Sequence, residues 1–332
     1  MPAGRRVAIR AAQVALAAAL VGGAVWTASH GVAGVTLSDV VTVLVGVDPW
    51  RLAMLAGFWF GGLCIYAVVL SAALPGLGVR RSLVLNLSGS AVANVIPLGG
   101  AVATALNWRM VRGWGHSNRS FVSFCMLTNA FDVGAKLVLP LVAVATLVIF
   151  SMHVPTPLWI AAAIPVAALV AILLLRPWLR RTATVGPERT SRWLARVMVQ
   201  VREAVAHLRR VAVRSWRPMV PGSLLYVAAQ VLLLYLCLDT AGAKIAFPVV
   251  LAAAAVERLV SLVPITPGGT GVAEAATVAW LLAAGADPTS AIAGVLLYRL
   301  FLFAMEIPVG GAVLACWALL HRTPSPEPAA AA

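Results

Sequence analysis

The chain has 332 residues, of which 61% are hydrophobic and 11% charged, and its 25 lysines and arginines against 11 acidic residues give a net charge of +14. A soluble globular domain is about half apolar and a quarter charged, so this composition excludes an ordinary soluble fold. The basic residues stand between long apolar runs rather than in a patch with stacking aromatics. This argues against nucleic-acid binding and favours loops beside anionic lipid headgroups.

The first two membrane spans are predicted near the N-terminus. Residues 7–29 form an apolar run long enough to cross a bilayer, which takes about 20 residues. Signal peptides share its arginine-rich start, but more spans follow, so we predict an uncleaved helix with a cytoplasmic N-terminus. Residues 31–50 carry two aspartates and no basic residue, which predicts an outer segment, and residues 51–73 return the chain to the cytoplasm.

A first interrupted segment covers residues 82–108, where Asn94, Pro97, Gly99 and Gly100 break the apolar run. Arginines flank this segment on both sides. Because basic flanks stay in the cytoplasm, we predict a hairpin that enters the membrane from that side and returns to it.

Two further spans, residues 121–150 and 157–175, lead to the strongest positive-inside signal of the chain. Residues 176–217 hold eleven arginines and two acidic residues, with apolar residues recurring at steps of three and four. We predict an amphipathic helix on the inner leaflet, bound through apolar burial and anionic lipid. A solvated charged loop is the alternative.

The second interrupted segment lies in the C-terminal half. Residues 219–238 cross outward, residues 239–244 make an outer turn, and the apolar residues 247–284 are broken at 264–271, where the sequence is P-I-T-P-G-G-T-G. Residues 288–320 form the last span and lead to a cytoplasmic C-terminus. Because the two interrupted segments start from opposite sides, they predict an inverted repeat of discontinuous helices.

Together these elements predict an all-α fold, a polytopic transmembrane helix bundle of about six to eight membrane segments with two discontinuous or re-entrant elements. Residues 1–322 form a single transmembrane domain, and the low-complexity tail 323–332 is predicted to be disordered. The predicted location is the cytoplasmic membrane, with both termini inside.

The second break is a candidate binding site. Pro267 stops helical hydrogen bonding, and Gly268, Gly269 and Gly271 allow backbone angles that other residues resist. Unpaired backbone at membrane depth survives only where it is buried or lines a wet cavity. A helix starting near Thr270 directs its positive end into such a cavity, which suits a phosphate or carboxylate. The alternative is a plain kink or a tight surface loop.

Ionisable residues inside the apolar segments form the second candidate feature, because each costs about 2.5–3.5 kcal/mol on insertion scales. They are Asp132, Lys136, Glu257, Arg258, Glu274, Arg299 and Glu306. Asp132 and Lys136 are four residues apart, so they can neutralise each other. Glu257 and Arg258 are neighbours that point differently, so each needs a partner elsewhere. Structural ion pairs remain the alternative for any single residue, but the cluster that also includes Glu274 and Arg299 favours a phosphate-binding site.

Catalytic and cofactor motifs are not expected. The five histidines have no metal-ligand spacing, and the four cysteines stand inside apolar runs as buried hydrophobes. The sequence has no phosphate-binding loop, nucleophile elbow or dinucleotide fingerprint. Tyr298 and Trp280 are interpreted as interface or packing aromatics rather than catalysts. We therefore expect no cofactor, no metal and no catalytic residue.

The interrupted segments carry a family resemblance. The stretch E-R-L-V-S-L-V-P-I-T-P-G-G-T-G-V-A-E (257–274), followed by Y-R (298–299) and I-P-V-G-G (307–311), resembles the C-terminal signature of the lysylphosphatidylglycerol synthase transmembrane region family. The stretch A-N-V-I-P-L-G-G-A-V-A-T-A-L-N-W-R (93–109) resembles its first motif in a Gly-rich variant. The resemblance implies a flippase-like integral membrane protein of about eight membrane segments that moves a phospholipid or lipid-linked substrate between leaflets.

Departures from the family pattern bear on the headgroup. Many members carry Glu and Arg where this chain has Ala101 and Thr104, and Glu where it has Asn129, whereas Asp132 is retained. The aminoacyl-transferring domain of bifunctional relatives is not expected within these residues, so we do not expect them to aminoacylate lipid.

The leading hypothesis is a translocase of a phospholipid or lipid-linked substrate, with membrane lipids as its partners. Arg258 and Arg299 would bind a headgroup phosphate, while Glu257 and Glu274 balance those charges or meet a cationic headgroup. One alternative is a membrane enzyme or accessory subunit acting on polyprenyl-phosphate-linked glycans. Another is a scaffold that recruits partners through residues 176–217.

Overall fold

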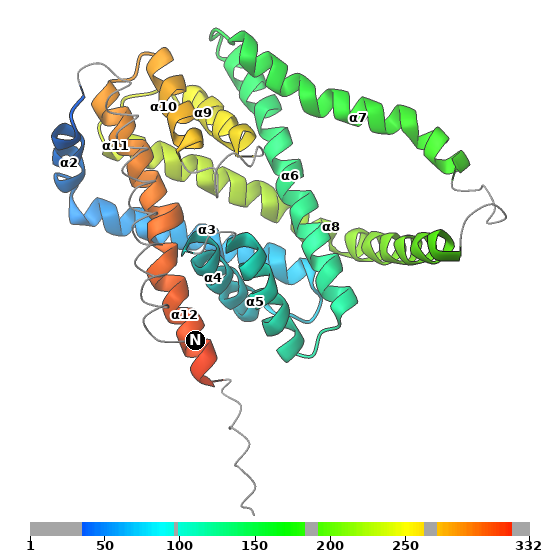
Figure 1. Ribbon diagram of the computed structural model, residues 1–332. Coiled ribbons are helices and arrows are strands. Elements are labelled where there is room, and N and C mark those ends of the chain that lie inside the picture. The colour runs from blue at the N-terminus through cyan, green and yellow to red at the C-terminus, as the bar shows by residue number, and fades with distance from the viewer. Residues whose placement is uncertain (1–34, 96–98, 183–191, 262–270, 321–332) are drawn as a thin grey trace, which may run out of the picture.

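A computed structural model describes residues 35–95, 99–182, 192–261 and 271–320, and every regular element in these ranges is a helix (Figure 1). The α-helices are α2 (Leu37–Val45), α3 (Pro49–Ala73), α4 (Val79–Val95), α5 (Gly99–Gly113), α6 (Asn118–Ile149), α7 (Thr156–Thr182), α8 (Arg192–Thr240), α9 (Phe247–Val260), α10 (Val272–Ala283), α11 (Pro288–Arg299) and α12 (Glu306–Leu320), with a π-helix, η3 (Leu300–Ala304), between the last two. The predicted all-α fold is confirmed.

Four helical stretches are long and apolar enough to cross a membrane: Pro49–Ala73, Asn118–Ile149, Ser215–Thr240 and Pro288–Leu320. Each corresponds to a predicted span, because runs of this length satisfy the bilayer thickness and leave few charges to bury. The predicted first span, residues 7–29, and the tail 323–332 lie outside the described residues, as do Pro97, Pro267, Gly268 and Gly269.

Both interrupted segments are helical hairpins. In the first, α4 packs against α5. Arg81 in the first turn of α4 has its guanidinium carbon 5.6 Å from the ring centre of Trp114, which follows the end of α5. In the second, α9 packs against α10, and the Trp280 indole N–H donates to the Val249 carbonyl over 3.2 Å. Each hairpin therefore begins and ends on one side of the bundle, as predicted for the first.

The last span joins the two hairpins. Its first half, α11, packs against α10, and its second half, α12, packs against α4. At Gly310 the two helices approach so closely that a Cβ atom would overlap the Leu87 carbonyl oxygen. The hairpins thus contact opposite halves of one span (Figure 1). This arrangement agrees with the predicted inverted orientation.

Two features of the helices go beyond the predictions. The predicted amphipathic stretch within 176–217 is helical from Arg192 onward, and α8 runs without a break into the predicted span 219–238 even though Pro218 and Pro221 lie inside it. The predicted span 288–320 is matched in full, with the π-helix η3 inside it. Prolines did not end α8, and no proline or glycine marks η3, whose sequence is L-F-L-F-A, so local composition revealed neither feature.

Candidate functional site

The tip of the second hairpin is shaped by Gly271, which starts α10. Its φ of 89° lies in the left-handed region that favours glycine. The Gly271 N–H donates to the Glu274 carboxylate over 2.7 Å, so Glu274 caps the first turn of α10. This fixes the Glu274 side chain beside the last turn of α11, where the next charged residue stands.

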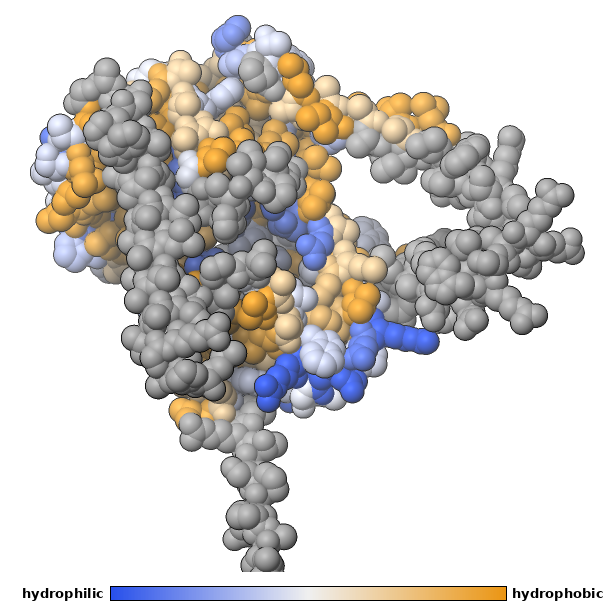
Figure 2. Space-filling model, in the orientation of Figure 1, coloured by the Kyte–Doolittle hydropathy of each residue, from blue (hydrophilic) through white to orange (hydrophobic). Residues whose placement is uncertain are grey.

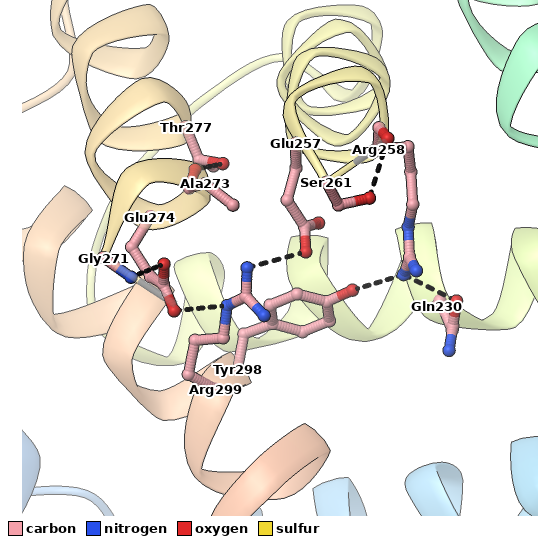
Figure 3. A network of polar contacts seen from close by, with 10 residues as sticks. All are labelled: Gln230, Glu257, Arg258, Ser261, Gly271, Ala273, Glu274, Thr277, Tyr298 and Arg299. Carbon is pink, nitrogen blue, oxygen red and sulfur yellow. Dashed lines mark hydrogen bonds and ion pairs between the residues drawn. The ribbon is translucent and has the colours of Figure 1, made fainter. Parts of the chain in front are cut away.

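Arg299 at the end of α11 lies between two carboxylates from the second hairpin (Figure 3). Its Nη2 atom is 3.1 Å from Glu257 Oε1, and its Nε atom is 3.0 Å from Glu274 Oε1. The three side chains are only 12%, 6% and 12% exposed for Arg299, Glu257 and Glu274. One guanidinium therefore balances two buried carboxylates, and the triad carries a formal charge of −1. It ties α9, α10 and α11 together.

Arg258 points away from this triad. Its Nη2 atom donates to Gln230 Oε1 over 2.6 Å and to the Tyr298 hydroxyl over 3.1 Å (Figure 3). Both partners are neutral, so within the described part of the chain no carboxylate lies within ion-pair distance of this guanidinium. The prediction that Glu257 and Arg258 find different partners is confirmed.

A small pocket opens beside Arg258, between α3, α6, α8 and α9. Tyr66 and Tyr226 stack on one wall, with ring centres 4.5 Å apart and planes at 23°. Asp132 and Lys136 lie on the α6 wall as an ion pair of 2.9 Å, which confirms that they neutralise each other. The pocket therefore combines one guanidinium, neutral hydrogen-bonding groups and apolar walls.

The first hairpin tip is held by Gly99 and Asn94. Gly99 starts α5, and a Cβ atom there would overlap the Ala93 carbonyl, so the turn requires glycine. Asn94, in the last turn of α4, donates through Nδ2 to Glu306 Oε2 over 3.5 Å. Gly100 faces open space.

The structure gathers only part of the predicted site. Glu257, Glu274 and Arg299 form one triad, Arg258 sits beside it, and Asp132 lines the adjoining pocket. The residues Asn94, Gly99 and Gly100 belong instead to the first hairpin tip, next to Glu306.

Sequence reasoning missed Gln230 and Tyr66, and it treated Tyr226 only as part of a span and Tyr298 as a packing aromatic. Tyr298 is buried and bonded to Arg258, so its hydroxyl belongs to the polar network. A buried amide inside an apolar span was the available signal for Gln230, because such groups need a hydrogen-bond partner. Within the described ranges, no three His, Cys, Asp or Glu side chains gather in a way that could hold a metal ion.

A comparison with models of known protein families gives a match. The model of the family described as the lysylphosphatidylglycerol synthase TM region matches residues 13–310, a stretch that includes both hairpins and the polar cluster. A search of curated proteins gives no match.

Proposed function

The chain belongs to the lysylphosphatidylglycerol synthase transmembrane region family, and on this premise we propose that it moves a phospholipid or lipid-linked substrate between membrane leaflets without a chemical step. The observation that carries the proposal is Arg258, a half-buried guanidinium with neutral partners at the edge of a pocket.

The partners that Arg258 and Arg299 already have decide which of the two could bind a phosphate. Arg299 already faces two carboxylates, so a phosphate there would add a further negative charge to a site of formal charge −1. Arg258 offers guanidinium N–H groups whose present partners are uncharged, and a guanidinium fork suits phosphate oxygens. We therefore assign the headgroup phosphate to Arg258 and a positioning role to Arg299.

The lining of the small pocket suits a lipid on its α6 side. Apolar side chains such as Phe131 and Val227 line it together with the polar groups, which fits a molecule that has both a polar head and an apolar chain. Asp132 is 46% exposed, so its carboxylate stands at the open side of the pocket and can meet a cationic group of the headgroup. Access through the outer face of α6 would let the acyl chains remain in lipid.

The charge distribution supports a cytoplasmic-membrane location with the first hairpin entering from the inside. Arg80 and Arg81 begin α4, and Arg109 and Arg112 lie in the last turns of α5, at the same end of the hairpin. Hydrophilic surface gathers near the junction of α5 and α6, whereas apolar side chains are frequent among the other coloured residues (Figure 2). By the positive-inside rule this end faces the cytoplasm.

The test uses purified protein in vesicles of phosphatidylcholine and phosphatidylglycerol that contain a fluorescent phosphatidylglycerol, with a membrane-impermeant quencher to report its leaflet. Wild-type protein should expose inner-leaflet label faster than empty vesicles. Arg258→Ala should lower this rate about tenfold or more, because a hydrogen bond to a charged group is worth about 1.5–3 kcal/mol. Arg258→Lys, which keeps the charge but loses the fork, should fall between them.

The exposed Arg109 supplies the matched control, since Arg109→Ala removes a guanidinium from the same chain outside the pocket. Thermal unfolding in detergent identifies variants that fail to fold. The translocase proposal would be overturned if vesicles with wild-type protein exposed inner-leaflet label no faster than empty vesicles, both with this label and with lipid-linked anionic probes. Full activity in a folded Arg258→Ala protein would overturn the assignment of the phosphate.

A further inference from the structure

Glu306 is a buried carboxyl group that the proposed lipid site does not use. It is the first residue of α12, separated from η3 by Met305, and is 8% exposed. Its Oε2 atom accepts from Asn94 Nδ2 over 3.5 Å, and Ser90 also hydrogen-bonds its side chain. Both partners lie on α4, so Glu306 joins the first hairpin to the last span.

The surroundings of Glu306 contain no counterion in the part of the chain that the structure describes. On α4 the charged residues are Arg80 and Arg81, at the opposite end of the helix, and η3 is apolar throughout. On α11 the nearest charge is Arg299, which is engaged by its two carboxylates. From α8 the titratable group whose field reaches Glu306 is Tyr226, a neutral phenol. An ionised carboxylate here would be buried without a cation, which is costly.

The partner atoms favour a proton over a metal cation. The Asn94 amide presents its N–H to the Glu306 carboxyl, a donor that cannot ligate a cation. A sodium ion would need several oxygen ligands, whereas Asn94 presents an N–H donor where one of those oxygens would have to be. A protonated carboxyl can accept from this amide and use its own O–H for a second bond, so the neutral form is satisfied in the closed site.

The position of Glu306 gives its protonation a mechanical consequence. Arg299 and Glu306 lie on either side of η3, and each holds a different hairpin to the last span. A π-helical turn is rare in proteins and is often found at functional sites. Loss of the proton would create a charge that demands water, which requires the tip of the first hairpin to separate from α12.

We propose that Glu306 is the proton-binding site that couples lipid translocation to a transmembrane pH gradient. This inference rests on the proposed translocase function. The step is a simple protonation: the carboxylate takes up one proton when its surroundings close around it and releases the same proton when water reaches the first hairpin tip. Binding and release occur in different conformations, so proton movement and hairpin movement are linked.

The first experiment measures leaflet enrichment. Vesicles as above carry a one-unit pH gradient, with the membrane potential clamped by valinomycin and equal potassium. With one proton per lipid, wild-type protein should enrich the labelled phosphatidylglycerol in one leaflet by up to about tenfold, since one pH unit is a tenfold ratio of proton activity. Glu306→Gln should give no enrichment. Asp239→Asn, which neutralises an exposed carboxylate in the last turn of α8, should behave as wild type.

The second experiment does not depend on transport. Infrared difference spectra of the detergent-solubilised protein, titrated over about pH 4 to 9, cover the range of carboxyl groups in proteins. Wild type should show a protonated-carboxyl band that titrates and that Glu306→Gln lacks. Absence of a Glu306-dependent band overturns the proton site, even if no lipid moves.

The outcomes separate the two proposals. Wild-type protein that moves no lipid overturns the translocase, while the infrared band still decides whether Glu306 binds a proton. Lipid movement that ignores the pH gradient, or enrichment that persists in Glu306→Gln, overturns the coupling and leaves the translocase standing. Enrichment driven by a sodium gradient at constant pH would overturn the proton in favour of a cation.

Discussion

At the tip of the second hairpin, Glu257 and Glu274 hold one guanidinium between them, whereas at the tip of the first a lone carboxyl, Glu306, faces an amide and a hydroxyl. Both contacts are made with the same span, on either side of η3. The ion triad fixes its geometry through charge-assisted bonds, while the neutral contact depends on whether one proton is present. The comparison suggests that the second hairpin is an anchor and the first is the part that moves.

The largest effect is expected at the anchor. Arg299→Ala removes the shared cation and leaves two buried carboxylates facing each other, and Glu257 Oε2 already has no hydrogen-bond partner. Breaking a buried ion pair in this way costs about 3–5 kcal/mol, so the free energy of unfolding in detergent should fall by that order. Restoring neutrality with Glu257→Gln and Glu274→Gln in the same chain should recover much of the loss. An Arg299→Ala protein as stable as Arg109→Ala would show that the triad is not an anchor.

A smaller effect is expected where the first hairpin meets α12. Gly310→Ala places a Cβ atom on the Leu87 carbonyl and 2.9 Å from Ala91 Cβ, and the backbone carbonyl cannot rotate away. Overpacking of this kind costs about 1–3 kcal/mol. Amide hydrogen exchange should therefore rise in α4 and α5 while α9 and α10 keep their protection.

The neighbouring Gly311 provides the matched control, because a Cβ atom there meets nothing within 4 Å. Gly311→Ala should be neutral or stabilise by up to about 1 kcal/mol, since alanine is the better helix former. Equal loss of protection in both hairpins of Gly310→Ala would mean that they move as one unit, which contradicts the proposed division between anchor and moving part.

Sequence could supply the spans, the two hairpins and the charged residues, because hydrophobic length and basic flanks are properties of the chain itself. It could not supply the pairing of those charges. Arg258 and Arg299 look alike in sequence. Only the assembly of α8, α9, α10 and α11 places two carboxylates beside Arg299, and Gln230 and Tyr298 beside Arg258. The π-turn at η3 was equally hidden, because its apolar residues suit a regular helix as well.

The smallest effect is expected at Asp287, which caps α11 far from both hairpin tips. It accepts from the Ser290 N–H over 2.9 Å and from the Ser290 hydroxyl over 2.8 Å, and these bonds hold the pKa of its carboxyl below the ordinary value of 3.8. Because the folded pKa is the lower one, the cap is fully stabilising above pH of about 4 and is lost as pH falls through the folded pKa. Asp287→Ala should cost about 1 kcal/mol in denaturant unfolding at neutral pH.

This last change sharpens the comparison because it weakens the last span without touching either hairpin contact. The stability difference between wild type and Asp287→Ala should shrink as the pH is lowered below about 4, since the wild-type cap is then protonated as well. Hydrogen exchange at both hairpin tips should remain as in wild type. If removing the cap instead loosened the first hairpin while the second stayed protected, motion would spread along the whole span rather than arise at Glu306, and the protonated carboxyl would no longer be needed to explain which hairpin moves.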